Sequence, residues 1–451
     1  MKLVKRALLV ALALAMALSA AACGGNGGSG SGSGGGGEVK PADTSYIVDG
    51  KINNENLIKM MPTQYKGSTI KFYNWYDPYK LEQEGVIIDE FQEKFGVKVE
   101  MIYGEYNMYN DYLAGLMATG DAPDVMRMLA PSAAMLQALQ PIKNTGFVFD
   151  ESVWSKYTAD TYTVDGVCYG VNLINTSMFI PYLVLYNTDT MKNMGFDDPY
   201  ELWEKDKWTW DAFASMCRTW VKQGSDYYGC NMWPRSAVAS SAGKSFCSFD
   251  GKQWKFSDTD KTLTACWQFT LQGIKDRIFG GDRDSVDATD QRTLFAICDG
   301  TGVAVSSTNN YMRKLKAKGK FGFAPIPRWK DSEYYVVDDN YLAYGVCKGC
   351  ANPGPVPYFL AYYLNLDNYN DDGKQYFIND KAAKMMEKLR TEYKRSGEMT
   401  LEICKADQKW FPNTMFNECE PGQIATYIET WKPVISRCFD IHNEVLKNLE
   451  K

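Results

Sequence analysis

The chain has 451 residues, of which 45% are hydrophobic and 23% are charged, a composition typical of globular proteins. Acidic residues outnumber basic ones, which gives a formal net charge of −6, and no basic block interrupts the sequence. Since nucleic-acid binders carry basic patches, we do not expect a nucleic acid or another polyanion as the ligand.

The first 22 residues have the pattern of a signal peptide for secretion. Three basic residues precede an unbroken apolar run from Ala7 to Leu18, and small residues follow it. About 12 apolar residues are too few to cross a bilayer of ~30 Å, so the pattern predicts a cleaved leader. The mature chain would then keep 46 basic and 55 acidic residues, a net charge near −9.

Cys23 stands directly after three alanines, where bacterial lipoprotein processing would cut the chain and attach lipid. Ala20 occupies a place where leucine is usual, so plain secretion stays open as an alternative. A Gly/Ser stretch up to Gly37 behaves as a flexible coil. We expect residues 23–66 to form a lipidated cysteine, a tether and a polar surface extension, which holds the protein at the extracytoplasmic face of the cell membrane.

Regular structure is predicted to start at Ser68. Alternating and helical patterns follow each other with short connections and glycines at the helix ends. They predict a strand over 69–75, a helix over 81–95, a strand over 97–101, a helix over 109–118 and a strand over 124–128. This order favours a parallel sheet that is covered by helices.

The second half repeats the pattern, so the length favours two α/β domains. Thr209 is expected to cap a helix whose apolar residues recur at helical spacing. A C-terminal helix should begin near Gln423 and break or kink at Pro433. Further strands are predicted over 181–186, 302–306, 321–326 and 341–347, and a further helix over 357–366.

Eleven cysteines follow Cys23, so at least one thiol cannot pair within the chain. Cys347 and Cys350 form a close pair that could be a redox motif or half a zinc site. A second pair at zinc spacing is missing, and His442 is the sole histidine. We therefore expect a turn with two structural or reduced cysteines, and neither a metal nor a cofactor.

Four segments of the chain resemble the bacterial extracellular solute-binding proteins of the maltodextrin-binding type, the receptors of sugar ABC importers. The segment 118–125 reads Ala-Thr-Gly-Asp-Ala-Pro-Asp-Val and is similar to a recurring phrase of that family. All four occur in the family's order between residues 68 and 445. The segments are 91–100, 118–125, 165–213 and 321–327.

The resemblance implies an α/β, two-lobe periplasmic-binding-protein-like fold of type II, with three inter-lobe crossings. The crossings are expected near residues 170–173, 299–302 and 337–340. The N-terminal lobe would comprise 67–172 plus 301–338, and the C-terminal lobe 173–300 plus 339–451. A ligand would then lie between the lobes, beside the carboxyl ends of parallel strands.

Sugars present apolar C–H faces and rings of hydroxyls, so their sites combine aromatic rings with amides or carboxylates. Trp75 follows the first predicted strand directly and is our first candidate. Arg127 and Met128 are candidates at the loop where maltodextrin receptors place an aromatic residue and a carboxylate. That carboxylate is absent here, so the family's maltodextrin contacts do not carry over at this loop. The remaining candidates lie at strand ends, at the crossings and in loops: Tyr76, Asp77, Asn172, Asn175, Trp233, Ser306, Asn309, Asp339, Asn340 and Trp410.

The leading hypothesis is a monomeric, non-catalytic receptor that captures a carbohydrate and passes it to ABC transporter permease subunits. A surface glycan-binding protein without a transport role is the first alternative. A secreted glycan hydrolase is the second, although the adjacent acids Asp371 and Asp372 lie in turn-like surroundings and suggest no catalytic pair.

Overall fold

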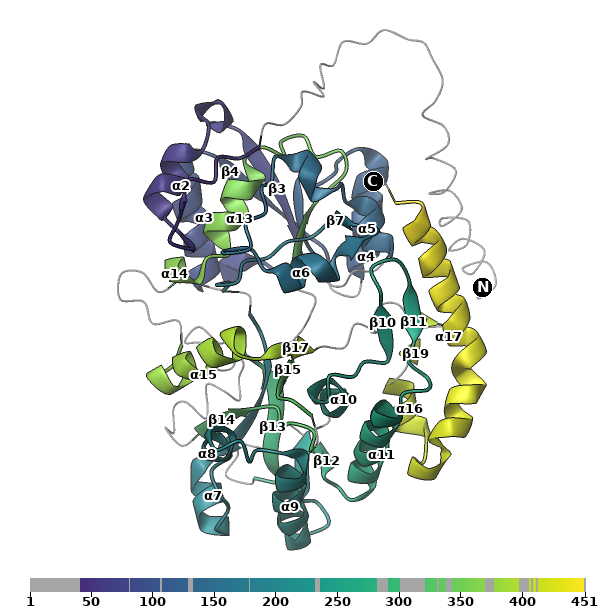
Figure 1. Cartoon of the computed structure of the whole chain (residues 1–451). Helices are drawn as coiled ribbons and strands as arrows, with labels where there is room; N and C mark the ends of the chain where they lie inside the picture. The colour runs from purple at the N-terminus through teal and green to yellow at the C-terminus, as the bar shows by residue number, and fades with distance from the viewer. Residues whose placement is uncertain are drawn as a thin grey trace. The chain divides into compact units, whose positions relative to one another are not determined.

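The computed structural model of the chain describes residues 41–80, 82–105, 108–128, 133–177, 179–231, 236–281, 291–300, 321–330, 332–337, 343–369, 377–396, 405–406, 409–410 and 413–449. Residues 39–451 form one compact unit that is built on two β-sheets (Figure 1). The predicted signal peptide and Cys23 lie outside the described residues.

The first sheet has four strands in the order β16-β5-β3-β4. As predicted, β3, β4 and β5 are parallel. A helix between successive strands carries the chain back across the sheet, so that each strand runs in the same direction as the one before it. The fourth strand, β16, pairs antiparallel with β5. Their bounds are Thr69–Asn74 for β3, Lys98–Tyr103 for β4, Val125–Met128 for β5 and Ala343–Val346 for β16.

Figure 1 shows α2, α3 and α13 to one side of these strands, and α4 and α5 to the other. Two predicted stop signals are confirmed, because Gly96 and Gly120 take positive φ values of 68° and 77° where α3 and α4 end. The bounds are Asn54–Met60 for α2, Glu82–Phe95 for α3, Tyr109–Thr119 for α4, Ala133–Ala138 for α5, Val356–Tyr363 for α13 and Leu366–Tyr369 for α14.

The second sheet has five strands in the order β12-β9-β13-β8-β14. It is mixed rather than wholly parallel, because β8 pairs antiparallel with both β13 and β14. The bounds are Tyr182–Asn187 for β8, Tyr228–Asn231 for β9, Phe279–Gly281 for β12, Thr293–Asp299 for β13 and Phe321–Pro325 for β14.

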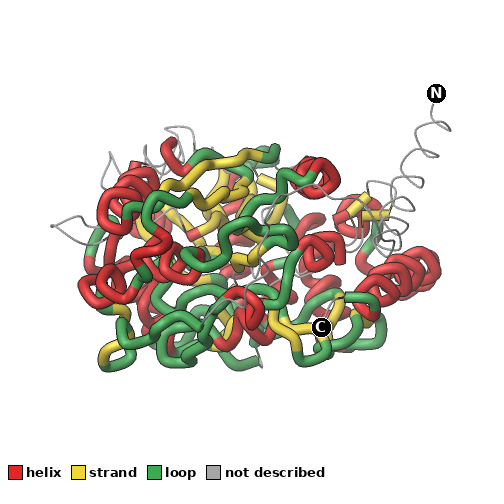
Figure 2. The backbone as a smooth tube through the Cα atoms, turned by 90° about the horizontal axis from the view of Figure 1, so that it is seen from above, coloured by secondary structure: helices red, strands yellow, loops and turns green. Residues whose placement is uncertain are grey.

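Helices α8, α9 and α11 pack against this second sheet, and the view of Figure 2 shows strands lying among helices. The Thr209 hydroxyl accepts a hydrogen bond from the Ala212 N–H at 3.3 Å, so the predicted helix cap is confirmed. The helices here are Thr188–Met194 (α7), Pro199–Glu204 (α8), Trp210–Trp220 (α9), Ala237–Ser241 (α10), Lys261–Lys275 (α11), Asp380–Thr391 (α15) and Asn413–Glu418 (α16).

Shorter strands form two-stranded ribbons at the borders of these layers. β15 pairs in parallel with β17, and the other pairs are antiparallel. The ribbons are Ile47–Val48 (β1) with Lys51–Ile52 (β2), Thr163–Val164 (β6) with Val167–Cys168 (β7), Cys247–Phe249 (β10) with Trp254–Phe256 (β11), Tyr335–Val337 (β15) with Lys394–Ser396 (β17), and Lys405–Ala406 (β18) with Lys409–Trp410 (β19).

The C-terminal helix α17 spans Ile424–Lys447 and runs on through Pro433, so the predicted break does not occur. Pro433 and Glu429, the residue four positions earlier, are both exposed. The helical turn that lacks the Pro433 N–H donor therefore lies at the surface of the protein, which favours a proline inside this helix. The helix packs against α5 and α11, and it lies along one side of the molecule in Figure 1.

The segment before Ser68 lies mostly at the surface, but it forms β1, β2 and α2 and is anchored to the core, so regular structure starts earlier than the predicted Ser68. Tyr46 is 2% exposed and Leu57 is fully buried. The Tyr46 ring lies 6.4 Å from the ring of Tyr358 on α13, and α2 packs against the same helix. Two apolar anchors thus bind a polar segment to the first lobe, which a search for periodic patterns misses.

Sheet membership corrects two parts of the predicted lobe boundaries. β14 was expected in the N-terminal lobe but pairs with β8 in the second sheet. β16 was expected in the C-terminal lobe but pairs with β5 in the first sheet. Both errors arise because the chain stays in the second sheet through β14 and returns to the first sheet only at β16.

The predicted crossings have different outcomes. Val171 forms a bridge with Tyr344 on β16, and the next sheet strand is β8, so the chain passes from the first sheet to the second after 171, close to the predicted 170–173. A second passage falls between β14 of the second sheet and β16 of the first, and the predicted 338–340 within this interval lie outside the described residues. The strands before and after the predicted crossing at 299–302 belong to the same sheet, although residues 301–320 are outside the described ranges.

Candidate functional site

The carboxyl ends of β3 and β5 meet at one edge of the first sheet, and β16 begins at the same edge. Trp75 directly follows β3, as predicted, and its side chain is half-buried. A half-buried indole at the carboxyl edge keeps part of its apolar surface available to a ligand. We refer to Trp75, Tyr76, Asp77, Arg127 and Met128 as the edge cluster.

Arg127 lies beneath Trp75 in this cluster. Its guanidinium carbon is 4.1 Å from the centre of the Trp75 ring and 5.2 Å from that of Tyr76. Its Nη1 donates a hydrogen bond of 2.5 Å to the Tyr76 hydroxyl. The side chain is only 2% exposed, so it faces the interior and offers almost no surface to a ligand.

A buried carboxylate completes the arrangement. Glu84 on α3 accepts hydrogen bonds from the Tyr76 hydroxyl at 2.8 Å and from the Tyr363 hydroxyl on α13 at 2.7 Å. Burial raises the pKa of the Glu84 carboxyl, while Arg127 and the two hydroxyls oppose that rise. Glu84 and Tyr363 were not predicted, although a glutamate in the first turn of an amphipathic helix is a signal that could have been followed.

The other two members of the edge cluster make structural contacts. An Asp77 oxygen accepts hydrogen bonds from the Tyr79 N–H and from the Tyr103 hydroxyl, both at 3.0 Å. Met128 is fully buried, and its sulfur packs where a side chain on Gly170 would have to lie. No surface of Met128 is accessible in this structure, and its role as a ligand contact stays a prediction.

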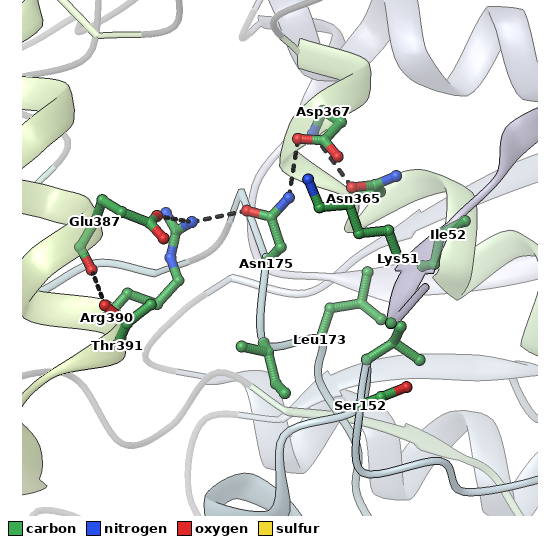
Figure 3. Close-up of a pocket in the computed structure, with 13 residues that line it drawn as sticks. Lys51, Ile52, Ser152, Leu173, Asn175, Asn365, Asp367, Glu387, Arg390 and Thr391 are labelled. Atoms are coloured by element: carbon green, nitrogen blue, oxygen red, sulfur yellow. Dashed lines mark hydrogen bonds and ion pairs between the residues drawn. The ribbon is translucent and has the colours of Figure 1, made fainter. Parts of the chain in front are cut away.

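A second group of predicted residues lies at the first crossing. Asn175 lines a cavity of about 300 Å³ between the first lobe and α15 (Figure 3). Its amide donates to Asp367 at 3.0 Å and accepts from Arg390 of α15 at 2.7 Å. The cavity residues are Gly50, Lys51, Ile52, Ser152, Val153, Leu173, Ile174, Asn175, Asn365, Asp367, Glu387, Arg390 and Thr391.

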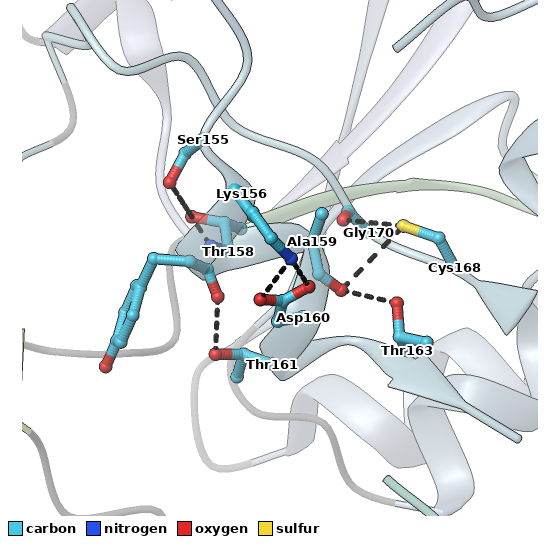
Figure 4. A network of polar contacts seen from close by, with 10 residues as sticks. Ser155, Lys156, Thr158, Ala159, Asp160, Thr161, Thr163, Cys168 and Gly170 are labelled. Carbon is cyan, nitrogen blue, oxygen red and sulfur yellow. Dashed lines mark hydrogen bonds and ion pairs between the residues drawn. The ribbon is translucent and has the colours of Figure 1, made fainter. Parts of the chain in front are cut away.

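Asn172 is directed into the protein and is 3% exposed, and its role as a ligand contact stays a prediction. Its side-chain oxygen accepts from the Leu173 N–H at 2.8 Å, and its carbonyl accepts from the Ser155 N–H. Ser155 also belongs to the polar network of Figure 4, in which the Cys168 thiol donates to the Gly170 carbonyl at 3.4 Å. These bonds fix the backbone that leads into the crossing.

The remaining candidates cannot be placed. Trp410 falls within β19, but its side chain is outside the described part of the structure. The others lie outside the described residues altogether: Trp233, Ser306, Asn309, Asp339 and Asn340. These six positions stay predictions.

The two-cysteine turn has a structural explanation. The Cys350 thiol donates to an Asp124 oxygen at 3.0 Å, and the Cys347 N–H donates to the Asp124 carbonyl. Burial raises the pKa of both thiols, which opposes the thiolate form that redox chemistry and zinc binding need. Within the described ranges, no three His, Cys, Asp or Glu side chains gather closely enough to hold a metal ion.

Two sheets flanked by helices, joined by a chain that passes repeatedly between them, define a two-lobe α/β binding protein. The chain belongs to the bacterial extracellular solute-binding proteins, whose family model matches residues 82–368. A search of curated proteins finds no match.

Three solved structures are similar to this chain in fold. The GacH receptor of Streptomyces glaucescens, solved with acarbose, is 12% identical with a TM-score of 0.55, over 85% of this chain and 99% of that one. Lmo0181 of Listeria monocytogenes, solved with cycloalternan, is 15% identical with a TM-score of 0.57, over 84% and 99%. The lacto-N-biose complex of GL-BP from Bifidobacterium longum is 13% identical with a TM-score of 0.58, over 86% and 98%.

Proposed function

We propose that this protein is a non-catalytic receptor that binds a carbohydrate, most simply an oligosaccharide, between its two lobes and delivers it to the permease subunits of an ABC importer. The observation that carries the proposal is the half-buried Trp75 at the carboxyl edge of the first sheet, stacked on Arg127. The receptors of similar fold were solved with acarbose, cycloalternan and lacto-N-biose, which supports a saccharide ligand.

The proposal includes the location of the protein. The leader pattern and Cys23 support a lipid anchor on the extracytoplasmic face, and the protein would act there as a monomer. None of the described helices is both long and apolar enough to cross a membrane. The lobes would divide along the two sheets, with β16 and α13 in the first lobe and β14 in the second.

A thermal-shift screen across oligosaccharides tests this function. A ligand present at 100 times its dissociation constant adds about 2.7 kcal/mol to the stability of the folded state. At least one oligosaccharide should therefore raise the melting temperature, and chromatography of the same mixture should return the sugar intact. Absence of any shift would contradict the carbohydrate assignment, and release of shorter products would favour the hydrolase.

Trp75→Ala should weaken binding by about 1–3 kcal/mol, because it removes the apolar plate on which a sugar face would rest. Isothermal titration calorimetry with the best oligosaccharide measures the loss. Trp431→Ala is the matched control, since Trp431 is also a half-buried tryptophan but lies on α17. Equal affinities in the two variants would remove Trp75 from the site.

A further inference from the structure

The guanidinium of Arg127 is held from several directions. Beyond the stack on Trp75, its Nη1 donates to the Tyr76 hydroxyl, which in turn donates to Glu84. Tyr363 donates to the same Glu84 oxygen from α13. Side chains from α3, α13 and the turn after β3 therefore fix one planar cation, which β5 carries.

The backbone that carries Arg127 is fixed as well. The Tyr109 hydroxyl on α4 donates to the Arg127 carbonyl at 2.8 Å, and Arg127 faces Tyr344 across the β5–β16 pair. The Tyr109 ring also meets the Trp75 ring edge-on, with centroids 5.9 Å apart. Arg127 below the indole and Tyr109 beside it restrict the orientation of Trp75.

We propose that Arg127 is a positioning residue that holds the Trp75 ring in the orientation in which it stacks on a sugar, an inference that rests on the proposed function. A planar guanidinium can lie flat against an indole, whereas the ammonium of lysine is a point charge on a flexible stem. A ring that is already fixed loses less conformational entropy when the ligand binds.

The burial of Arg127 separates this role from that of a ligand contact. At 2% exposure it cannot give a sugar more than a small part of its surface, and the Tyr76 hydroxyl already occupies Nη1. Its effect on the ligand must pass through Trp75. The proposal therefore makes a specific prediction: substitutions at Arg127 should no longer change the affinity for the sugar once Trp75 is removed.

The test combines a readout without ligand and one with ligand. Protein labelled with 5-fluorotryptophan is studied by ¹⁹F NMR, and Trp75→Phe assigns the Trp75 signal. Arg127→Lys should broaden or split that signal and leave the signal of the fully buried Trp208 unchanged. Arg292→Lys is the matched control, because the Arg292 guanidinium also lies over an aromatic ring, that of Tyr227 at 5.0 Å. These two residues directly precede β13 and β9, so they lie at the amino ends of strands in the second sheet.

The ligand readout is a double-mutant cycle with the oligosaccharide that gives the largest thermal shift. Arg127→Lys should weaken binding about tenfold in the natural chain and should have no further effect in Trp75→Ala. Tyr76→Phe keeps the ring but removes the link to Glu84, and it should act in the same direction with a smaller effect. This second variant decides the question if Arg127→Lys does not fold.

The outcomes separate the two proposals. A Trp75 signal as sharp in Arg127→Lys and Tyr76→Phe as in Arg292→Lys would overturn the positioning role, whatever ligand binds. Losses of affinity that simply add in the double variant would also overturn it. If no oligosaccharide binds the natural chain, the proposed function fails, and the width of the Trp75 signal decides the role of Arg127 on its own.

Discussion

Asp124 connects three segments of the first lobe through a single carboxylate. One oxygen accepts from the Lys71 N–H on β3 at 2.8 Å, and the other accepts from the Asn352 N–H at 3.1 Å and from the Cys350 thiol. The residue is 2% exposed. Asp124 lies in segment 118–125, one of the four on which the family resemblance rested, so the scaffold explains this part of the resemblance.

Asp124→Asn should lower the free energy of unfolding by about 1–3 kcal/mol. The amide of the new asparagine places an NH₂ group opposite the N–H of either Lys71 or Asn352. At least one buried N–H group then has no acceptor. Urea denaturation followed by circular dichroism measures the change. Asp121→Asn is the control, because Asp121 is an exposed partner of Lys71 and such ion pairs contribute about 0–1 kcal/mol. A loss of stability no larger than in this control would contradict the account of Asp124.

The edge cluster shows what could be predicted at single residues. The position of Trp75 followed from the strand before it, because the residue after a parallel strand lies at the carboxyl edge. The burial of Arg127 and Met128 could not be predicted in this way. All four residues of β5 are buried, so the sequence shows no alternation of apolar and polar residues that would mark an accessible face. Glu84 and Tyr363 come together from α3 and α13, helices that are distant in sequence and have no shared pattern.

At the scale of elements, helix α9 follows from its sequence. Phe213, Met216, Cys217 and Trp220 recur at helical spacing and are all buried, and Thr209 caps the first turn. Strand pairing is less predictable. β14 and β16 were recognised as strands, but a short apolar strand does not encode its neighbour, so both were assigned to the wrong lobe.

Thr209→Ala should cost about 1 kcal/mol of stability, because the Ala212 N–H loses its acceptor at the start of α9. Thr219→Ala in the last turn of the same helix is the control. Thr219 is exposed, and alanine has the higher helix propensity, so this variant should be neutral or slightly stabilising. Thermal unfolding of both variants gives the comparison, and equal effects would show that the cap contributes nothing.

At the scale of the whole molecule, the first crossing lies beside the segment that joins α13 to α14. Thr176 forms a bridge with Asn365, and the Leu366 N–H donates to the Asn175 carbonyl. The side chain of Asn175 connects Asp367 to Arg390, and so joins the crossing to α15. Helix α15 contacts α8 of the second lobe through the ion pair between Lys384 and Glu204. We therefore expect the Asn175 amide to restrain how far the lobes can separate.

Asn175→Ala should widen the range of lobe angles in the unliganded protein, because it removes the hydrogen bond that joins the crossing to Arg390 of α15 and the one that joins it to Asp367 of α14. Small-angle X-ray scattering should then give a larger radius of gyration without ligand and an unchanged one with saturating ligand. Binding should weaken by the factor by which the binding-competent population falls. Gln92→Ala is the matched control, since the Gln92 amide also joins two elements, accepting from the Val99 N–H at 3.0 Å, but within the first lobe. If the two variants scatter alike without ligand, Asn175 does not restrain the lobes, and their separation must be limited by the packing of the crossing segments themselves.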